Sequence, residues 1–288
     1  MNLTETRLSD VASVFTHGGE TLLESYGSNA TVFFGKGAVV VVDPFVAPRQ
    51  AAALGARIAD RTPDPVTHVV LTHHHTDHAL GASFFASLGA DVIAHEAAAR
   101  RMAVEHGALI AERRRDPALG GLFDGAEPHA PKRLVRDSLA LEAGGIRFDV
   151  FHPGHAHTPG DLCVYVPALG VLVSGDLVST GYHPNLEDAD VAGWRAALVR
   201  LRRIPFWTLV PGHGPAGGRE AAEEQIAYFD AAERTVREAA EFGFDPVAAL
   251  KAAFPERLLT VVLPDAVRAL SARLNRASLD APASSGGA

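Results

Sequence analysis

The sequence has 288 residues, of which 47% are hydrophobic and 21% are charged, and its formal net charge is −8 at pH 7. This balance is typical of a soluble globular protein, so a disordered or fibrous chain is excluded. Domains that grip nucleic-acid phosphates usually carry the opposite charge, so nucleic acid is not a favoured partner. Cys163 is the single cysteine, so no internal disulfide can form.

The chain contains no run of about 18 consecutive apolar residues, so we expect no membrane-spanning helix and no membrane partner. The first ten residues, MNLTETRLSD, lack the basic start and the apolar run of a secretory signal. These two observations predict a cytoplasmic protein.

Strand-like and helix-like segments alternate in the first third of the chain. Gly35, Lys36 and Gly37 separate two β-rich runs, which indicates a hairpin. An alanine-rich run opened by Pro48 indicates a helix. The alternation predicts an α/β layered fold. The expected elements are strands over 31–34 and 38–42, a helix over 48–61, a strand over 68–72, a helix over 80–88 and a strand over 91–94.

A helix pattern over 96–115 ends in three arginines, Arg113 to Arg115. These arginines could meet an acidic substrate or form a solvated end of the helix. The segment 116–132 is rich in proline and glycine and is expected to be a loop. Long loops in compact domains are often functional lids, and a plain surface connection is the alternative.

The second half of the chain returns to strands and then becomes helical. From residue 217 onward the pattern is helical, so we expect a C-terminal helical appendage over 217–280. Residues 281–288 are small and polar and are expected to form a disordered tail. The expected elements are strands over 146–151, 162–166, 171–174 and 208–210, and helices over 189–203, 219–241, 246–254 and 264–275.

The most informative segment, Leu71-Thr72-His73-His74-His75-Thr76-Asp77-His78, directly follows a predicted strand. In extended chain His73 and His75 share one face, Asp77 continues that face, and His78 must come from a turn or a helix start. Imidazole and carboxylate are good ligands for zinc and iron, so this crowding predicts a metal site. His74 points to the other face and is expected to be structural.

Three further segments bring polar side chains to strand ends, where α/β enzymes place their sites. The first, from His152 to Asp161, reads HPGHAHTPGD and precedes a strand. The second is Ser174-Gly175-Asp176, and the third is Pro211-Gly212-His213-Gly214.

The pattern His73-x-His75-x-Asp77-His78, followed by His157, Asp176 and His213, resembles the metallo-β-lactamase fold superfamily. Ser28-Asn29 and Asp43-Pro44 resemble the opening motifs of that family, and the resemblance covers about residues 10–216. It implies a four-layer αββα sandwich over 1–216, with the metals at one edge between two sheets.

The resemblance also implies a ligand set. His73, His75 and His157 would hold one metal, Asp77, His78 and His213 would hold a second, and Asp176 would bridge the two. His155 is the alternative to His157, and Asp43 would support the histidine loop through hydrogen bonds. The implied cofactors are two divalent ions, Zn(II) first, with Fe or Mn as alternatives.

One major subclass of antibiotic-degrading β-lactamases has a cysteine where this chain has Asp176. An aspartate there is similar to the glyoxalase II, lactonase, arylsulfatase and tRNA-processing nuclease branches. The resemblance therefore implies a dinuclear hydrolase that uses a metal-bound hydroxide on an ester, thioester or lactone of a small molecule. The alternatives are a phosphodiesterase or nuclease, and a mononuclear iron persulfide dioxygenase.

Four residues are expected to act on the substrate or the nucleophile. Asp77 would orient the hydroxide, while Tyr182 and His183 follow Asp176 closely and are expected at the metal rim as substrate contacts. Tyr26 could line the mouth of the site. The expected partner is a small-molecule substrate, and the helical appendage could make the contact of a homo-oligomer.

Overall fold

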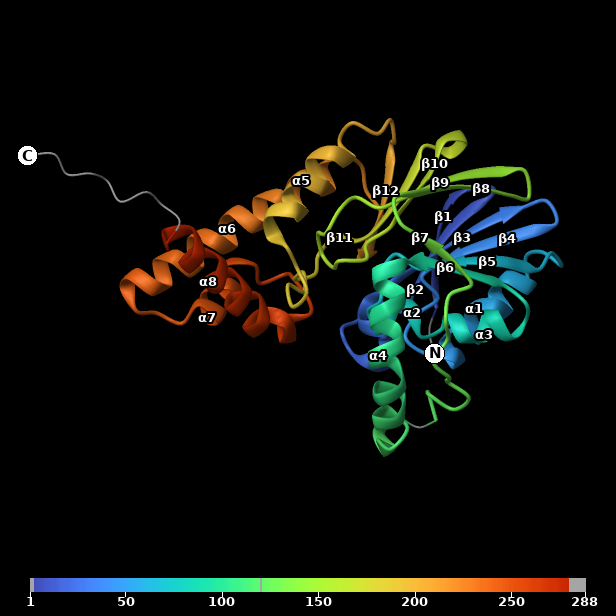
Figure 1. The fold of residues 1–288 in the computed structure, drawn as a ribbon, viewed down its shortest axis with the longest axis horizontal. Coiled ribbons are helices and arrows are strands. Elements are labelled where there is room, and N and C mark those ends of the chain that lie inside the picture. Colours follow the sequence, from blue (N-terminus) through green and yellow to red (C-terminus); the bar gives the residue numbers. More distant parts are fainter. Residues whose placement is uncertain (1–2, 120, 280–288) are drawn as a thin grey trace, which may run out of the picture.

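The computed structural model describes residues 3–119 and 121–279, and its strands form two sheets (Figure 1). In the first sheet the strands lie in chain order, antiparallel from β1 to β4 and parallel from β4 to β7. Its seven strands are β1 (Thr4–Ser9), β2 (Ala12–Thr16), β3 (Asn29–Gly35), β4 (Ala38–Val42), β5 (Val66–Val70), β6 (Asp91–His95) and β7 (Arg133–Val135).

The second sheet pairs β11 and β12 in parallel and the other neighbours antiparallel. Valines and other apolar residues from the inner faces of both sheets form one buried cluster, in which the rings of Phe33 and Phe148 meet edge to face at 5.2 Å. Its strands, in spatial order, are β12 (Thr208–His213), β11 (Val171–Ser179), β10 (Cys163–Val166), β9 (Ile146–Phe151) and β8 (Ser138–Ala143).

Helices cover the outer faces of both sheets. Leu54 and Ile58 of α1 (Pro48–Ala59) and Phe85 of α3 (Ala82–Ser87) belong to a cluster against the first sheet. Trp194 of α5 (Val191–Leu201) and Phe229 of α6 (Glu220–Phe242) cover the second. The order of layers is therefore helix, sheet, sheet, helix, as the sequence predicts.

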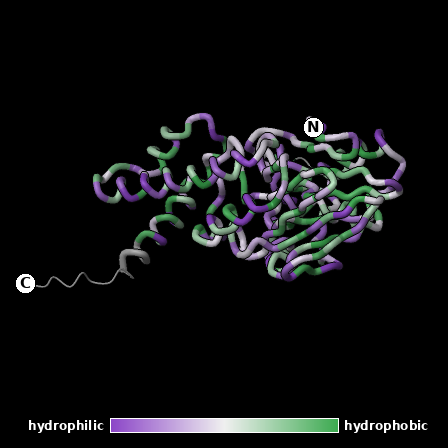
Figure 2. Tube along the Cα trace, turned by 90° about the horizontal axis from the view of Figure 1, so that it is seen from above, coloured by the Kyte–Doolittle hydropathy of each residue, from purple (hydrophilic) through white to green (hydrophobic). Residues whose placement is uncertain are grey.

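The C-terminal helices α6, α7 (Pro246–Ala253) and α8 (Leu263–Leu279) extend to one side of the sandwich (Figure 1). They alternate hydrophobic and hydrophilic positions along the trace (Figure 2). Their buried residues Tyr228, Leu250 and Leu270 belong to the same hydrophobic cluster as Trp194. The helical region thus shares a core with the second sheet, while the domain boundary at residue 216 stays a prediction.

The structure differs from the sequence-based expectation at several elements. One helix was expected over 80–88, but the chain forms α2 (Thr76–Ala79) and then α3, with Gly81 between them. Gly81 is required there because a Cβ would collide with the carbonyl oxygen of Pro44. Strand β11 is also longer than expected and runs to Ser179. The sequence predicted none of β1, β2, β7 and β8.

The segment 116–132, for which a lid was one reading, packs Leu122 and Phe123 against Ile110 of α4 (Glu96–Arg113). Within residues 3–119 and 121–279, every helix is too short or too polar to cross a membrane. The disordered tail expected over 281–288 lies outside the described residues.

Cys163 is fully buried at the start of β10, and burial raises the pKa of its thiol. Replacing Cys163 with serine should leave kcat/KM within about twofold, because the thiol neither lines the cleft nor approaches the histidine cluster. The free energy of unfolding should fall by about 1 to 3 kcal/mol, because a buried hydroxyl is desolvated. Steady-state kinetics and urea unfolding test this, and a complete loss of turnover in folded, metal-loaded protein would contradict it.

Candidate metal centre

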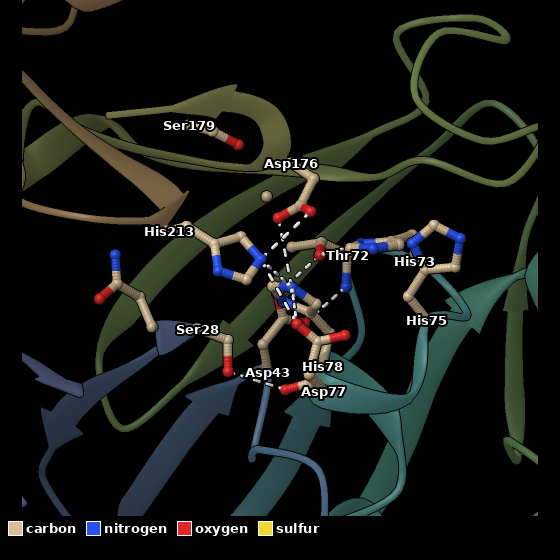
Figure 3. Close-up of polar contacts among 12 residues, drawn as sticks. Ser28, Asp43, Thr72, His73, His75, Asp77, His78, Asp176, Ser179 and His213 are labelled. Carbon is tan, nitrogen blue, oxygen red and sulfur yellow. Dashed lines mark hydrogen bonds and ion pairs between the residues drawn. The ribbon is translucent and has the colours of Figure 1, made fainter. Parts of the chain in front are cut away.

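The seven predicted ligand residues meet at one edge of the sandwich. All of them except His157 are labelled in Figure 3. They come from separate elements, because the carboxyl ends of β5 and β12 and the middle of β11 approach one another there. His73 and His75 follow β5, Asp77 and His78 lie in α2, His157 lies between β9 and β10, Asp176 lies in β11, and His213 ends β12.

The start of α2 replaces the extended geometry expected for Asp77. His75 has extended backbone angles and precedes the helix, so Asp77 and His78 are consecutive residues of its first turn. The chain turns here because Gly81 packs against the backbone of Pro44 and donates its N–H to the carbonyl of Phe45 at 2.9 Å. The turn brings the two side chains beside His213, and the ring of His78 also lies 4.4 Å from that of His73.

The first group of possible ligands is His73, His75 and His157. The Nδ1 atom of His75 lies 2.9 Å from Nε2 of His157. The ring of His73 lies 4.8 Å from that of His75 and 4.7 Å from that of His157. These three imidazoles are close enough to share one cation.

The second group is Asp77, His78 and His213. The Nε2 atoms of the two histidines lie 3.4 Å apart, and each is 3.3 Å from Oδ2 of Asp77. Asp176 lies between the two groups, since its carboxylate is 3.2 Å from His78, 3.3 Å from His213 and 3.6 Å from His157. A Cβ at Gly212 would collide with that carboxylate, so glycine leaves the space that Asp176 occupies.

All five imidazoles hold their outer ring nitrogen in a hydrogen bond. Because carbonyl and carboxylate oxygens accept, and the Thr72 hydroxyl donates its own proton to Asp43, these outer nitrogens carry a proton and the inner nitrogens face the cluster. The outer partners are Thr72 Oγ1 for His73 (3.0 Å), Asp188 for His75 (3.3 Å), Asp43 for His78 (2.9 Å), the carbonyl of Asn185 for His157 (3.1 Å) and the carbonyl of Tyr26 for His213 (3.0 Å). This arrangement is typical of metal-ligating histidines.

The donor set fits divalent cations. Inner nitrogens of His75 and His157 that lie 2.9 Å apart repel each other through their lone pairs unless a positive charge lies between them. Nε2 of His73 is buried and has no hydrogen-bond partner among the described residues, while Oδ1 of Asp176 is buried and contacts Nε2 of His78 at 3.2 Å. Buried polar atoms of this kind are otherwise costly, and nitrogen and carboxylate ligands of zinc would satisfy them.

The electrostatics of the cluster also indicate missing positive charge. Burial lowers the pKa of His73 well below 6.5 and that of His157 to about 3, so both imidazoles are neutral. Burial opposes charge on His213 too, but Asp176 raises its pKa to about 9. Without a bound cation, protonated His78 and His213 balance the negative charge of the carboxylates. A bound cation would supply that positive charge instead.

Asp43 supports the histidine loop from beneath, as the sequence predicts. Its carboxylate accepts hydrogen bonds from the backbone N–H of Thr72 (2.8 Å), from the Thr72 hydroxyl (2.6 Å) and from Nδ1 of His78 (2.9 Å). Asp43 is 2% exposed and has a left-handed φ of 58°, which aspartate tolerates better than most residues. Strained backbone of this kind is common at functional sites.

Behind the first group, His74 and Asp188 form a supporting layer. His74 is buried, and its Nε2 atom lies 3.3 Å from Asp188, whose carboxylate also contacts His75. His155, the alternative ligand, instead donates to the backbone carbonyl of Asp188 at 2.8 Å and stays outside the cluster. Sequence reasoning missed Asp188, because no local motif distinguishes it within the segment NLEDAD.

His106 of α4 donates its Nε2 proton to the carbonyl of His74 at 2.8 Å, and burial lowers its pKa to about 4. The unfolded chain takes up this proton below about pH 6.5, whereas the folded chain resists it, so stability is lost as pH falls from about 6.5 to about 4. Between about pH 7.5 and about pH 5 we expect a loss of about 2 kcal/mol from this group.

Urea unfolding of the wild type and of His106→Gln at both pH values isolates this effect, because the metal ligands are common to both chains. The glutamine amide can still donate to His74, so the variant should lose about 2 kcal/mol less on acidification. Identical losses in the two proteins would show that His106 does not contribute.

The structure does not bring the two predicted rim residues into the cleft. The Tyr182 hydroxyl donates to the carbonyl of Gly19 at 2.9 Å, and its ring packs 5.4 Å from that of His213. His183 is buried against Tyr228, whose hydroxyl is 2.9 Å from its Nδ1 atom. His183 therefore faces the helical appendage, whereas Tyr182 faces the loop around Gly19. Tyr26, by contrast, lines the cleft.

A cleft of about 730 Å³ opens over the cluster. Asp77, Asp176 and His213 are part of its wall. Helix α4 forms one side, and the segment around the short helix η4 (Thr260–Val262) at the start of α8 forms another. A cleft of this size is typical of a small-molecule site.

Comparison with known proteins agrees with this geometry. The model of the metallo-β-lactamase superfamily matches residues 24–213. The chain is 27% identical over 209 residues to the alpha subunit of 2,4-dinitroanisole O-demethylase from Nocardioides sp. (strain JS1661), covering 72% of this chain but only 58% of that subunit. It is also 27% identical over 201 residues to a type 2 metallo-β-lactamase from Bacillus cereus, covering 68% of this chain and 70% of that protein.

Solved structures show the same fold. A metallo-β-lactamase from Pontibacter korlensis superimposes with a TM-score of 0.62 at 24% identity, covering 78% of this chain and 98% of that one. One from Pseudomonas aeruginosa, in its mono-zinc form, gives 0.61 at 22% identity, covering 78% and 93%. The family match spans more than half of the sequence and contains all seven cluster residues. This chain therefore belongs to the metallo-β-lactamase superfamily, a family of metal-dependent, hydrolase-type enzymes.

Proposed function

We propose that this protein is a metal-dependent hydrolase that holds two divalent cations and cleaves an ester, thioester or lactone of a small molecule. Zinc is the first choice of metal, with iron or manganese as alternatives, because imidazole and carboxylate ligands suit all three. The observation that carries the proposal is the orientation of the five imidazoles, whose outer nitrogens are all bonded and whose inner nitrogens face one another.

In this proposal the two groups of residues hold one cation each. His73, His75 and His157 bind the first, Asp77, His78 and His213 bind the second, and Asp176 contacts both. Divalent cations bound there supply Lewis acidity and lower the pKa of a coordinated water to about 7.

The chain's own residues orient the site and exclude solvent. Asp43 and Asp188 fix the rings of His78 and His75 through their outer nitrogens. The carboxylate of Asp77 faces the cleft, so it can orient the attacking water and accept its proton. The walls from α4 and η4 limit access of bulk water to the scissile bond.

The choice of a carboxylic substrate rests on the bridging aspartate and on the acidic net charge of −8, which disfavours a nucleic acid. The relatives of this chain include an O-demethylase subunit and a β-lactamase, so a β-lactam belongs among the compounds to be tested.

The test is a substrate panel with zinc-loaded protein. It contains 4-nitrophenyl butyrate, the butyryl thioester of N-acetylcysteamine, δ-valerolactone, a cephalosporin and bis-4-nitrophenyl phosphate. We expect turnover of a carboxylic ester, thioester or lactone that a chelator abolishes and zinc restores. Turnover of the phosphodiester alone would make the protein a phosphodiesterase. One bound iron with rapid oxygen uptake on glutathione persulfide would make it a dioxygenase.

A further inference from the structure

Arg113, the last residue of α4, projects into the cleft beside the metal cluster. Its Nη2 atom donates to the hydroxyl of Thr76 at 3.1 Å, and Thr76 directly precedes the ligand Asp77. The guanidinium carbon lies 5.3 Å from the ring centre of Phe123. These contacts hold the guanidinium group in one orientation at the floor of the cleft.

Arg113 forms no ion pair with any residue in 3–119 or 121–279. Its Nη1 atom is buried and has no hydrogen-bond partner in the part of the chain that the structure describes. No carboxylate of the described residues lies within ion-pair distance of it, whereas Arg101 in the same wall contacts Glu105 at 2.6 Å and Asp188 at 3.0 Å. A buried guanidinium donor without an acceptor is costly, so a ligand atom is the natural partner.

The net charge around the metal cluster also favours an anionic ligand. This point rests on the proposed function, because it counts two bound cations. The buried carboxylates of Asp43, Asp77 and Asp176 contribute three negative charges, and two divalent cations would contribute four positive charges. Arg113 raises the surplus to two positive charges. Of the acidic wall residues, Glu105 and Asp188 both contact Arg101, Asp265 contacts Arg268, and Glu187 is exposed.

We propose that Arg113 is a specificity-determining residue that binds a carboxylate of the substrate in this cleft. The Nη1 atom carries two N–H donors in the plane of the guanidinium group, and such donors match the oxygen atoms of a carboxylate. Four other residues of the cleft wall are apolar: Val104 and Leu109 on α4, and Leu259 and Val261 near η4. The substrate class is therefore a small carboxylic acid that also carries an apolar group.

The experiment compares two esters that differ only in charge, 4-carboxyphenyl butyrate and its neutral carboxamide counterpart, 4-carbamoylphenyl butyrate. In Arg113→Met, kcat/KM for the carboxylate ester should fall about ten- to a hundredfold, as for other charged hydrogen bonds, while the neutral ester changes less than about threefold. Arg113→Lys keeps the positive charge but not the planar arrangement of N–H donors. The fall in kcat/KM for the carboxylate ester should therefore be intermediate.

Arg115→Met is the matched control, because it removes the same charge from an exposed position near the end of α4 that lies outside the cleft wall. It should leave the ratio of the two kcat/KM values unchanged. Metal content and circular dichroism of each variant establish that the chain is folded and loaded.

A second measurement does not depend on turnover. Titration calorimetry of the metal-loaded protein with 4-butanamidobenzoate, the amide analogue of the charged ester, should give a Kd that rises about ten- to a hundredfold in Arg113→Met. If the Kd rises in Arg113→Met while neither ester is cleaved, Arg113 binds a carboxylate but the protein is not an ester hydrolase. Equal losses of kcat/KM for both esters would overturn the proposal. A Kd for the amide that is unchanged in Arg113→Met, or no measurable binding of the amide to the wild type, would also overturn it.

Discussion

Replacing Asp176 with alanine should remove at least one cation per chain and lower kcat/KM by more than about a hundredfold. Loss of a residue that only orients a metal ligand costs up to about a hundredfold, so loss of a ligand should cost more. The reason is geometric, because this carboxylate alone approaches both groups, at 3.2 Å from His78 and 3.6 Å from His157. The fold should survive, since the deletion removes a buried charge without removing apolar packing. Plasma mass spectrometry, kinetics and thermal unfolding measure the three quantities.

Asp60→Ala is the control for this experiment, because it removes the same side chain from an exposed position at the end of α1. It should retain full metal content and activity. An Asp176→Ala protein with the metal content and activity of the wild type would contradict the bridging role.

Replacing Asp43 with asparagine should weaken zinc binding by about ten- to a hundredfold, which is typical for loss of a partner that orients a ligand. One carboxylate oxygen accepts from the Thr72 backbone, and an amide oxygen can replace it. The other oxygen accepts from both the Thr72 hydroxyl and His78, so an amide nitrogen there would face two donors. The free energy of unfolding should fall by about 1 to 3 kcal/mol in metal-free protein.

Zinc competition with a fluorescent chelator and urea unfolding measure these two effects. Asp64→Asn makes the same chemical change in an exposed loop, where the carboxylate accepts only from Gly37 among the described residues, and should alter neither quantity. If Asp43→Asn binds zinc as tightly as the wild type, Asp43 does not orient His78.

The ligand residues could be predicted because each lies in a short motif at a strand end. The spacing of His73 and His75 and the glycine turn around His213 are local signals, and the structure brings these residues together. The partners of the outer nitrogens could not be predicted in the same way. The carbonyls of Tyr26 and Asn185 have no residue type to detect, because any residue has a backbone carbonyl.

The differences in the fold have a similar origin. Strand β1 was not predicted because most of its residues are exposed or half-buried at the edge of the sheet, so it lacks a hydrophobic run. It forms because β2 supplies the hydrogen bonds. His183 was expected at the rim because it follows Asp176 closely, but β11 continues to Ser179 and carries the chain past the cleft. The length of a buried strand depends on its neighbours, which sequence patterns do not show.

The central claim is that the facing histidines and carboxylates bind two cations. The most direct measurement is the zinc content of wild-type protein after loading and exhaustive dialysis, determined by plasma mass spectrometry against protein concentration. We expect two zinc ions per chain, and one or fewer after His213→Ala, which removes a ligand of the second group alone. One or fewer tightly bound divalent cations per wild-type chain, with zinc, iron or manganese, would contradict the binding of two cations.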